Sequence, residues 1–255
     1  MNGRSAANEK VNGSPKQNGC ASDPLTHSLT DSLSFSNDWL IWQLADSAFP
    51  TGGFAHSSGL EAAYHHRAVH GGGELADYLR TALHQLVHAS LPYVHAGFTS
   101  EAPFAEADQH CDAFLSNHVA NRASRLQGQA FLSTCERTFG LRASRELQQE
   151  IVGKSLPGHN APVFGRVASL MELDAKATAQ LFIFVQLRSW ISAAVRLNIV
   201  GPMEGQRIQA VLTGDAERCA AEFGRTAMAE AAQNSPLLDL WQGTQDRLYS
   251  RLFQT

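Results

Sequence analysis

Residues 181–200 read LFIFVQLRSWISAAVRLNIV and form the most apolar stretch of the chain. The run is too long for a typical strand and suits a buried helix. It carries two central arginines, Arg188 and Arg196, together with Gln186 and Asn198. A helix facing lipid would lose a few kcal/mol for each central arginine. We therefore expect a buried helix of a soluble protein, with no membrane span.

The sequence around this stretch is helical in its periodicity. Asp174 suits the N-cap of the central helix, and Gly201-Pro202 should end it. A second apolar stripe repeats at three and four residues over 75–86. Further helices are expected over 38–47, 58–67, 105–139 (with a possible interruption), from 162, 205–212, 216–233 and 236–251. No convincing alternating run predicts a strand.

The predicted fold is an all-α, single-domain helical bundle of about eight to ten helices over residues 37–255. Residues 1–36 are rich in Asn, Gly, Ser and Lys and poor in large apolar side chains. Such a composition cannot offset the entropy of ordering, so a disordered N-terminal arm is predicted.

Composition limits the classes of function. The 255 residues are 44% hydrophobic with a formal net charge of −4, which argues against non-specific nucleic-acid binding. The four cysteines are scattered without a CxxC pair, and the N-terminal residues lack an apolar signal region. We expect reduced thiols and a cytoplasmic location.

Residues 49–61, FPTGGFAHSSGLE, combine glycines, hydroxyls and a histidine. A phosphate-binding loop of the GxxxxGK[ST] type needs a lysine, which this stretch lacks. Gly153-Lys154-Ser155 has the lysine, but Gln148 stands where the first glycine belongs. Nucleotide binding is therefore not predicted. Ser58 and Glu61 have the spacing of a capping box at the start of a helix.

Histidine pairs raise the question of a metal. His66 and His70, like His84 and His88, stand four residues apart, which places two imidazoles on one helical face. The glutamate of an HExxH motif is missing. There is no GxSxG elbow either, so no catalytic residue is predicted. A metal-dependent helical enzyme that uses the HxxxH pairs stays as the alternative.

Two other features predict contacts of a different kind. Arg188 and Arg196 lie in apolar surroundings, where a guanidinium must be paired, either within the chain or with a partner. The carboxyl-terminal segment 248–253, LYSRLF, is unusually apolar for a chain end. It should dock onto the body of the chain or onto another protein.

Five motifs together resemble the urease accessory protein F (UreF) family, in its eukaryotic, plant-type form. The motifs are QLADSAFPTGGFAHSSGLEAA at 43–63, NRASRLQGQAFL at 121–132, HNAPVFG at 159–165, SAAVRLNIVGPMEGQRI at 192–208, and SPLLD with LYSRLF at 235–239 and 248–253. Their order and spacing agree from Trp39 almost to the end of the chain. Many bacterial members carry tyrosine where His56 stands.

The resemblance implies an all-α homodimer without catalytic activity or a stably bound cofactor. It implies an adapter in nickel insertion, which binds an accessory protein of the D or H type and a GTPase of the G type and docks on apo-urease. Nickel is the delivered metal of that pathway. An alternative is that the chain activates the partner GTPase through an inserted arginine. The residues that the resemblance assigns to partner binding are Phe54, His56, Ser57, Glu61, Tyr249, Arg251, Leu252 and Phe253.

Overall fold

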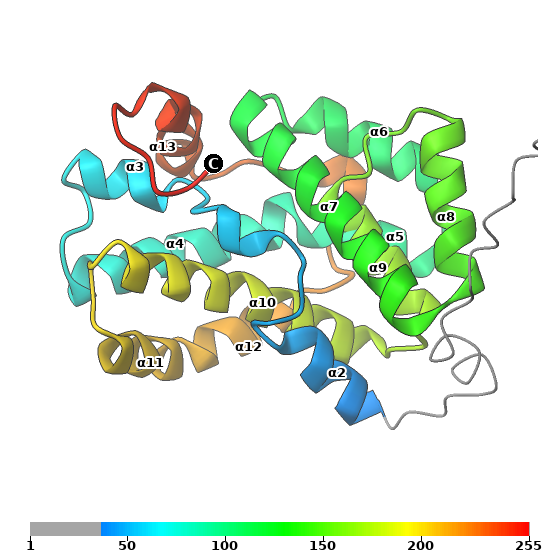
Figure 1. Ribbon diagram of the computed structural model, residues 1–255, viewed down its shortest axis with the longest axis horizontal. Coiled ribbons are helices and arrows are strands. Elements are labelled where there is room, and N and C mark those ends of the chain that lie inside the picture. Colours follow the sequence, from blue (N-terminus) through cyan, green and yellow to red (C-terminus); the bar gives the residue numbers. More distant parts are fainter. Residues whose placement is uncertain (1–36, 255) are drawn as a thin grey trace, which may run out of the picture. The chain divides into compact units, whose positions relative to one another are not determined.

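The computed structural model describes residues 37–254, and this part of the chain is helical without a β-strand. Figure 1 shows the helices, with the carboxyl-terminal segment returning beside α3. The all-α prediction is confirmed. The predicted disordered arm, residues 1–36, lies outside the described residues.

The α-helices are α2 Asn37–Ala45, α3 Leu60–His65, α4 Gly72–Ala89, α5 Leu91–Thr99, α6 Phe104–Phe114, α7 His118–Phe139, α8 Arg142–Gly153, α9 Asn160–Leu170, α10 Ala175–Arg196, α11 Pro202–Val211, α12 Thr213–Ala221 and α13 Pro236–Thr244.

The central helix is α10, which holds most of the apolar stretch quoted above. It contacts α2, α3, α4, α5, α9, α11 and α12. The Asp174 carboxylate caps it by accepting the Ala177 amide at 2.7 Å, as the sequence predicts. Trp190 is buried in the core. The longest apolar run of the sequence thus organises the bundle. Among the described helices, none has the length and apolarity needed to cross a membrane.

Several predicted helices end earlier than expected. The span 105–139 is broken into α6 and α7, because Asn117 accepts the amides of Val119 and Ala120 and so caps a new helix. The central helix stops at Arg196 rather than at Gly201, and Asn198 follows in the left-handed region with φ 57°. These breaks divide the described chain into more helices than the predicted eight to ten.

The carboxyl-terminal third departs furthest from prediction. The helix expected over 216–233 ends at Ala221. The helix expected to reach Arg251 ends at Thr244, and a single 3-10 turn, Gln245–Arg247, follows it. Residues 248–254, called the tail below, contain no helix. Because it is not helical, the tail can extend across other elements of the fold.

The capping box predicted for Ser58 and Glu61 is wrong. Ser58 has φ 52°, and Gly59 occupies the N-cap of α3 with φ 89°, so the chain turns through two left-handed residues there. The Ser57 hydroxyl accepts the Glu61 amide at 3.4 Å. The Glu61 carboxylate turns instead toward the tail.

Glycines allow two helices to pack backbone against backbone. A methyl group added at Gly97 of α5 would overlap the Pro162 carbonyl of α9, and one added at Gly165 of α9 would overlap the Val94 carbonyl of α5. Only glycine permits such an approach. Gly165 belongs to the 159–165 motif, so this motif serves packing.

Candidate partner-binding site

The loop between α2 and α3 is built from an anchor and an exposed tip. Phe49 is buried against Phe131 and Phe139, with ring centroids 6.5 and 6.1 Å away. Gly52 then reverses the chain at φ 76°, and the 3-10 turn Gly53–Ala55 follows. The Phe54 side chain stands at the tip of this turn and is 69% exposed. An anchored loop thus presents a large aromatic ring to solvent.

Arg196 at the end of α10 holds this tip. Its guanidinium carbon lies 3.7 Å from the centroid of the Phe54 ring and 4.2 Å from that of Phe253, so it is stacked between the two rings. Its Nη1 also donates to the Phe54 carbonyl at 2.5 Å. Burial lowers the pKa of Arg196, and the charge of Glu61 opposes this effect.

The sequence left open whether the two arginines of the central helix pair within the chain or face a partner. Arg188 donates to the backbone carbonyl of Ala45, and Arg196 to that of Phe54. Both therefore find a backbone acceptor within their own chain. Burial lowers the pKa of Arg188, against the opposing charge of Asp46.

The tail is fixed by one buried carboxylate. Glu61 is only 1% exposed. Its oxygens accept the backbone amides of Leu252 and Phe253, the latter at 3.1 Å, and the side-chain amide of Gln245. The Gln254 amide also donates to the Ala55 carbonyl at 2.8 Å, which ties the tail to the loop. A buried carboxylate needs such donors, because an unpaired charge in the interior is costly.

Asp246 links the tail to α7. Its carboxylate accepts from Arg122 at 2.9 and 3.0 Å and from Arg251 at 2.9 Å, and His118 Nε2 lies 3.4 Å away. Partial burial would raise the pKa of Asp246, but the hydrogen bond from Arg122 and the nearby positive charges outweigh it and lower the pKa.

The eight residues assigned by resemblance fall into two groups. Four have exposed side chains: Phe54, Tyr249, Arg251 and Leu252. Four are buried against their own chain: His56, Ser57, Glu61 and Phe253. The exposed group is available for contact with another molecule, whereas the buried group lies within the chain.

His56 is buried, with 5% of its surface exposed. Burial, with a smaller contribution from the positive charge of Arg122, lowers its pKa from 6.5 to about 4. The imidazole is therefore neutral at physiological pH.

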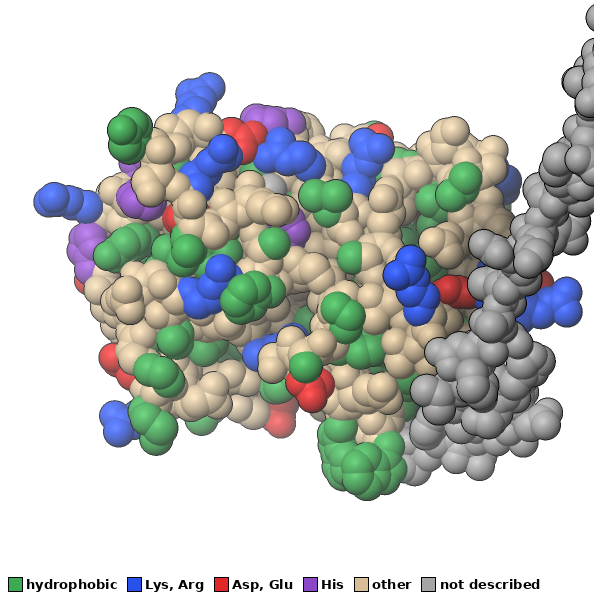
Figure 2. Space-filling model, in the orientation of Figure 1, with side chains coloured by type: hydrophobic (Ala, Val, Ile, Leu, Met, Phe, Trp, Pro, Cys, Tyr) green, Lys and Arg blue, Asp and Glu red, His purple; other side chains and the backbone are tan. Residues whose placement is uncertain are grey.

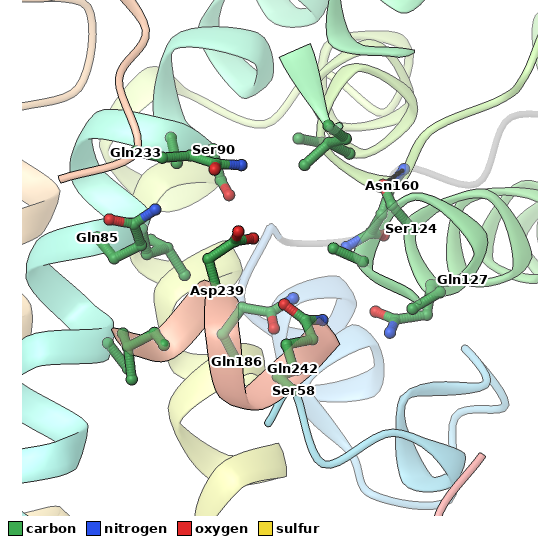
Figure 3. A pocket seen from close by; sticks show the side chains of 18 of the residues that line it. Ser58, Gln85, Ser90, Ser124, Gln127, Asn160, Gln186, Gln233, Asp239 and Gln242 are labelled. Atoms are coloured by element: carbon green, nitrogen blue, oxygen red, sulfur yellow. Dashed lines mark hydrogen bonds between the residues drawn. The ribbon is translucent and has the colours of Figure 1, made fainter. Parts of the chain in front are cut away.

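A separate cavity of about 180 Å³ lies among α4, α7, α9, α10 and α13. Figure 3 labels the polar side chains of its lining, which are glutamine, asparagine and serine with one carboxylate, Asp239, and apolar side chains make up the rest of the lining. Asp239 already accepts from Asn117 at 3.0 Å. The lining thiol, Cys111, has a pKa raised by burial and by Asp108 and Asp112, which keeps it protonated. The lining therefore presents neutral hydrogen-bonding groups rather than a nucleophile with its base.

The histidine pair on α4 brings two rings together. His84 and His88 have ring centroids 4.8 Å apart, and His84 Nδ1 lies 3.2 Å from the Asn234 side-chain amide. Within residues 37–254 no group of three or more His, Cys, Asp or Glu side chains is placed to hold a metal ion. Cys111, Cys135 and Cys219 are free thiols.

Sequence reasoning missed three residues of the site. These are Gln245, Asp246 and Arg122, which hold the tail in place. Gln245 and Asp246 lie in a helix that was predicted to continue, and their partners Glu61 and Arg122 are more than a hundred positions away in sequence. Arg196, in contrast, could be recognised from the sequence, because a charged side chain within an apolar helix requires a partner.

The fold and this surface define an all-helical protein whose candidate site is an exposed aromatic loop joined to a folded-back carboxyl-terminal tail. A family model described as UreF matches residues 69–213. Urease accessory protein F of rice (Oryza sativa subsp. indica) is 38% identical over 221 residues, covering 85% of each chain. That of Arabidopsis thaliana is 37% identical over 221 residues, covering 84% of this chain and 91% of the relative. An uncharacterized urease accessory protein UreF-like of Schizosaccharomyces pombe is 27% identical over 239 residues, covering 89% of this chain and 100% of the relative.

The chain therefore belongs to the UreF family of urease accessory proteins.

Proposed function

We propose that this protein is a non-catalytic adapter in urease maturation. In this proposal it forms a homodimer in the cytoplasm, binds an accessory protein of the D or H type, and with it recruits a G-type GTPase to apo-urease. It holds no cofactor of its own, and nickel is the cargo of the assembly. Family membership supports the pathway, and the exposed loop and tail support the adapter role.

The observation that carries the adapter role is the exposure of Phe54. A large aromatic ring that is 69% exposed is held rigidly by Arg196 and by the anchored loop beneath it. Rigid aromatic and arginine side chains dominate the energetics of protein interfaces. We assign direct partner contact to Phe54, Tyr249, Arg251 and Leu252. We assign positioning roles to His56, Ser57, Glu61 and Phe253.

Co-purification with the D-type protein and the GTPase, followed by an assay of urease activation, tests the proposal. Phe54→Ala should weaken recruitment of the GTPase while changing the melting temperature little, because the ring is outside the core and loses only its exposed contact with Arg196. Equal loss of both would instead make Phe54 a structural residue.

Removal of the residues after Asp246 is expected to abolish the complex with the D-type protein. That truncation also takes two amide donors from the buried Glu61 carboxylate. A companion double variant, Tyr249→Ala with Leu252→Ala, changes only exposed side chains. If both variants retain the complex, the tail is not a partner contact.

Two alternatives have their own measurements. A metal-dependent enzyme based on His84 and His88 requires stoichiometric metal on the purified chain, lost on His84→Ala. An activator of the GTPase requires faster GTP turnover when this chain is added. The adapter proposal expects neither result.

A further inference from the structure

The cavity among α4, α7, α9, α10 and α13 has a polar lining, of which the fold uses only a part. The Gln85 side-chain carbonyl accepts the backbone amides of Asn234 and Ser235, each at 2.9 Å. Asp239 accepts from the Asn117 side chain at 3.0 Å. These two lining groups are therefore engaged in holding the walls of the cavity together.

Four other lining side chains are carboxamides that the fold leaves unused. They are Gln127, Asn160, Gln186 and Gln242, which lie on α7, α9, α10 and α13 respectively. Within residues 37–254, none of these four side-chain amides exchanges a hydrogen bond with another protein group. Figure 3 shows them around the same cavity, and all four are half-buried. A polar group withdrawn from bulk water needs a hydrogen-bond partner, so their convergence from four helices indicates a binding site.

The packing of the helices does not account for these residues. Gln127 belongs to the 121–132 motif and Asn160 to the 159–165 motif, while Gln186 interrupts the apolar run of residues 181–200. The close approach at Gly165 requires a small residue there but no carboxamide at position 160. A glutamine within an apolar helix is costly unless its amide is satisfied. The cavity gives all three positions a common purpose.

The rest of the lining suits a molecule with an apolar part. It includes the rings of Phe182 and Trp190, both buried in the core. The cavity volume is about 180 Å³. At about 30 Å³ for each water molecule, such a space holds about six waters or one small organic molecule. Apolar walls with a few convergent polar groups are typical of small-molecule sites.

The charge of the lining limits the chemistry of the ligand. Among the described residues that line the cavity there is no Lys, Arg or His, so an anion finds no opposite charge. A cation finds one carboxylate, Asp239, which is already bonded to Asn117. Burial raises the pKa of the Cys111 thiol, which keeps it from acting as a thiolate. A carboxamide carries both N–H donors and a carbonyl acceptor, and a second amide group matches both.

We propose that this cavity is a binding site for a small, uncharged amide. The carbonyl of the ligand accepts from the lining carboxamides, its N–H groups donate to them, and its apolar part lies against Phe182 and Trp190. This site is additional to the proposed adapter function and does not depend on it, so either can fail without the other.

The first experiment compares three probes of the same size and shape that differ in charge: acetamide, acetate and acetamidinium. Each is titrated against the full chain near pH 7 and followed by saturation-transfer difference NMR. Acetamide should bind saturably with a Kd of about 1–10 mM, and each ion about tenfold more weakly or worse. Equal binding of the three probes, or tighter binding of either ion, would overturn the proposal. A cavity that holds only water, seen as no saturable binding of acetamide up to about 100 mM, would overturn it as well.

The second experiment places the binding in the cavity. Gln186→Leu removes one carboxamide at nearly constant size and should weaken acetamide binding by about tenfold. Gln180→Leu is the matched control, because Gln180 lies on the same helix, is exposed and does not line the cavity. Equal affinity of the two variants would show that the probe binds elsewhere.

A third variant keeps the test decisive if Gln186→Leu does not fold. Ala82 is a buried residue of α4 that lines the cavity, and Ala82→Leu fills part of the space while leaving every carboxamide in place. Circular dichroism checks that each variant is folded. Loss of acetamide binding in folded Ala82→Leu is the expected result, and binding as tight as that of the unmodified chain would contradict the proposal.

Discussion

The guanidinium of Arg196 lies 3.7 Å from the centroid of the Phe54 ring and also donates a hydrogen bond to the Phe54 carbonyl. One side chain therefore fixes both the ring and the backbone of the exposed tip. Because Arg196 is the last residue of α10, the loop is coupled directly to the central helix.

Arg196→Leu should lower the free energy of unfolding by about 1–2 kcal/mol, since it removes a cation–π contact and a hydrogen bond while keeping an apolar stem. Urea unfolding measures this. Arg218→Leu is a suitable control, because Arg218 lies on α12 with a side chain that is 75% exposed. A loss no larger than that of the control would mean that the stacked arrangement contributes nothing to stability.

Gly165→Ala should destabilise the fold by about 1–3 kcal/mol or more, because the added methyl group forces α5 and α9 apart. Gly73→Ala is the matched control, since a methyl group there meets nothing within 4 Å and alanine favours the helix. Thermal and urea unfolding should therefore separate the two variants. Similar stability for both would contradict the close packing.

Stability should fall as the pH is lowered from about 6.5 to about 4. The folded-state pKa of His56 is about 4, so in this window the unfolded state binds the proton more readily and acid favours unfolding. Burial also lowers the pKa of His159, which adds in the same direction, whereas burial raises the pKa of Asp108, which accepts the His159 amide and acts in the opposite direction. His56→Gln should flatten the dependence in part. Urea unfolding across this pH range provides the measurement.

Asp246→Asn should cost less than about 1 kcal/mol in stability, because exposed ion pairs contribute little. Its larger effect should be on the partner surface, since Arg122 and Arg251 lose their shared anchor. Asp77→Asn removes a comparable surface pair with Arg80 and serves as the control. This assignment would be wrong if Asp246→Asn left partner affinity unchanged and lowered the free energy of unfolding by several kcal/mol.

Much of the architecture follows from local sequence. The apolar run at 181–200 identified the central helix, and Asp174 identified its start, because helix caps and apolar stripes depend on neighbouring residues. The break at Asn117 was harder to place, since its side-chain oxygen serves as a cap only where the chain turns. The capping box was predicted wrongly, because Glu61 finds stronger donors in a segment 191 positions away.

The sequence by itself determined the helical class, the central helix, the family, and the two segments available for contact. Only the tertiary structure decided that Glu61 and Arg196 join those segments, that Phe253 is directed inward, and that Leu252 is left outside. The reason is physical. Periodicity and capping act over a few residues, whereas burial of a charge is settled by whichever distant donors the folded chain brings to it.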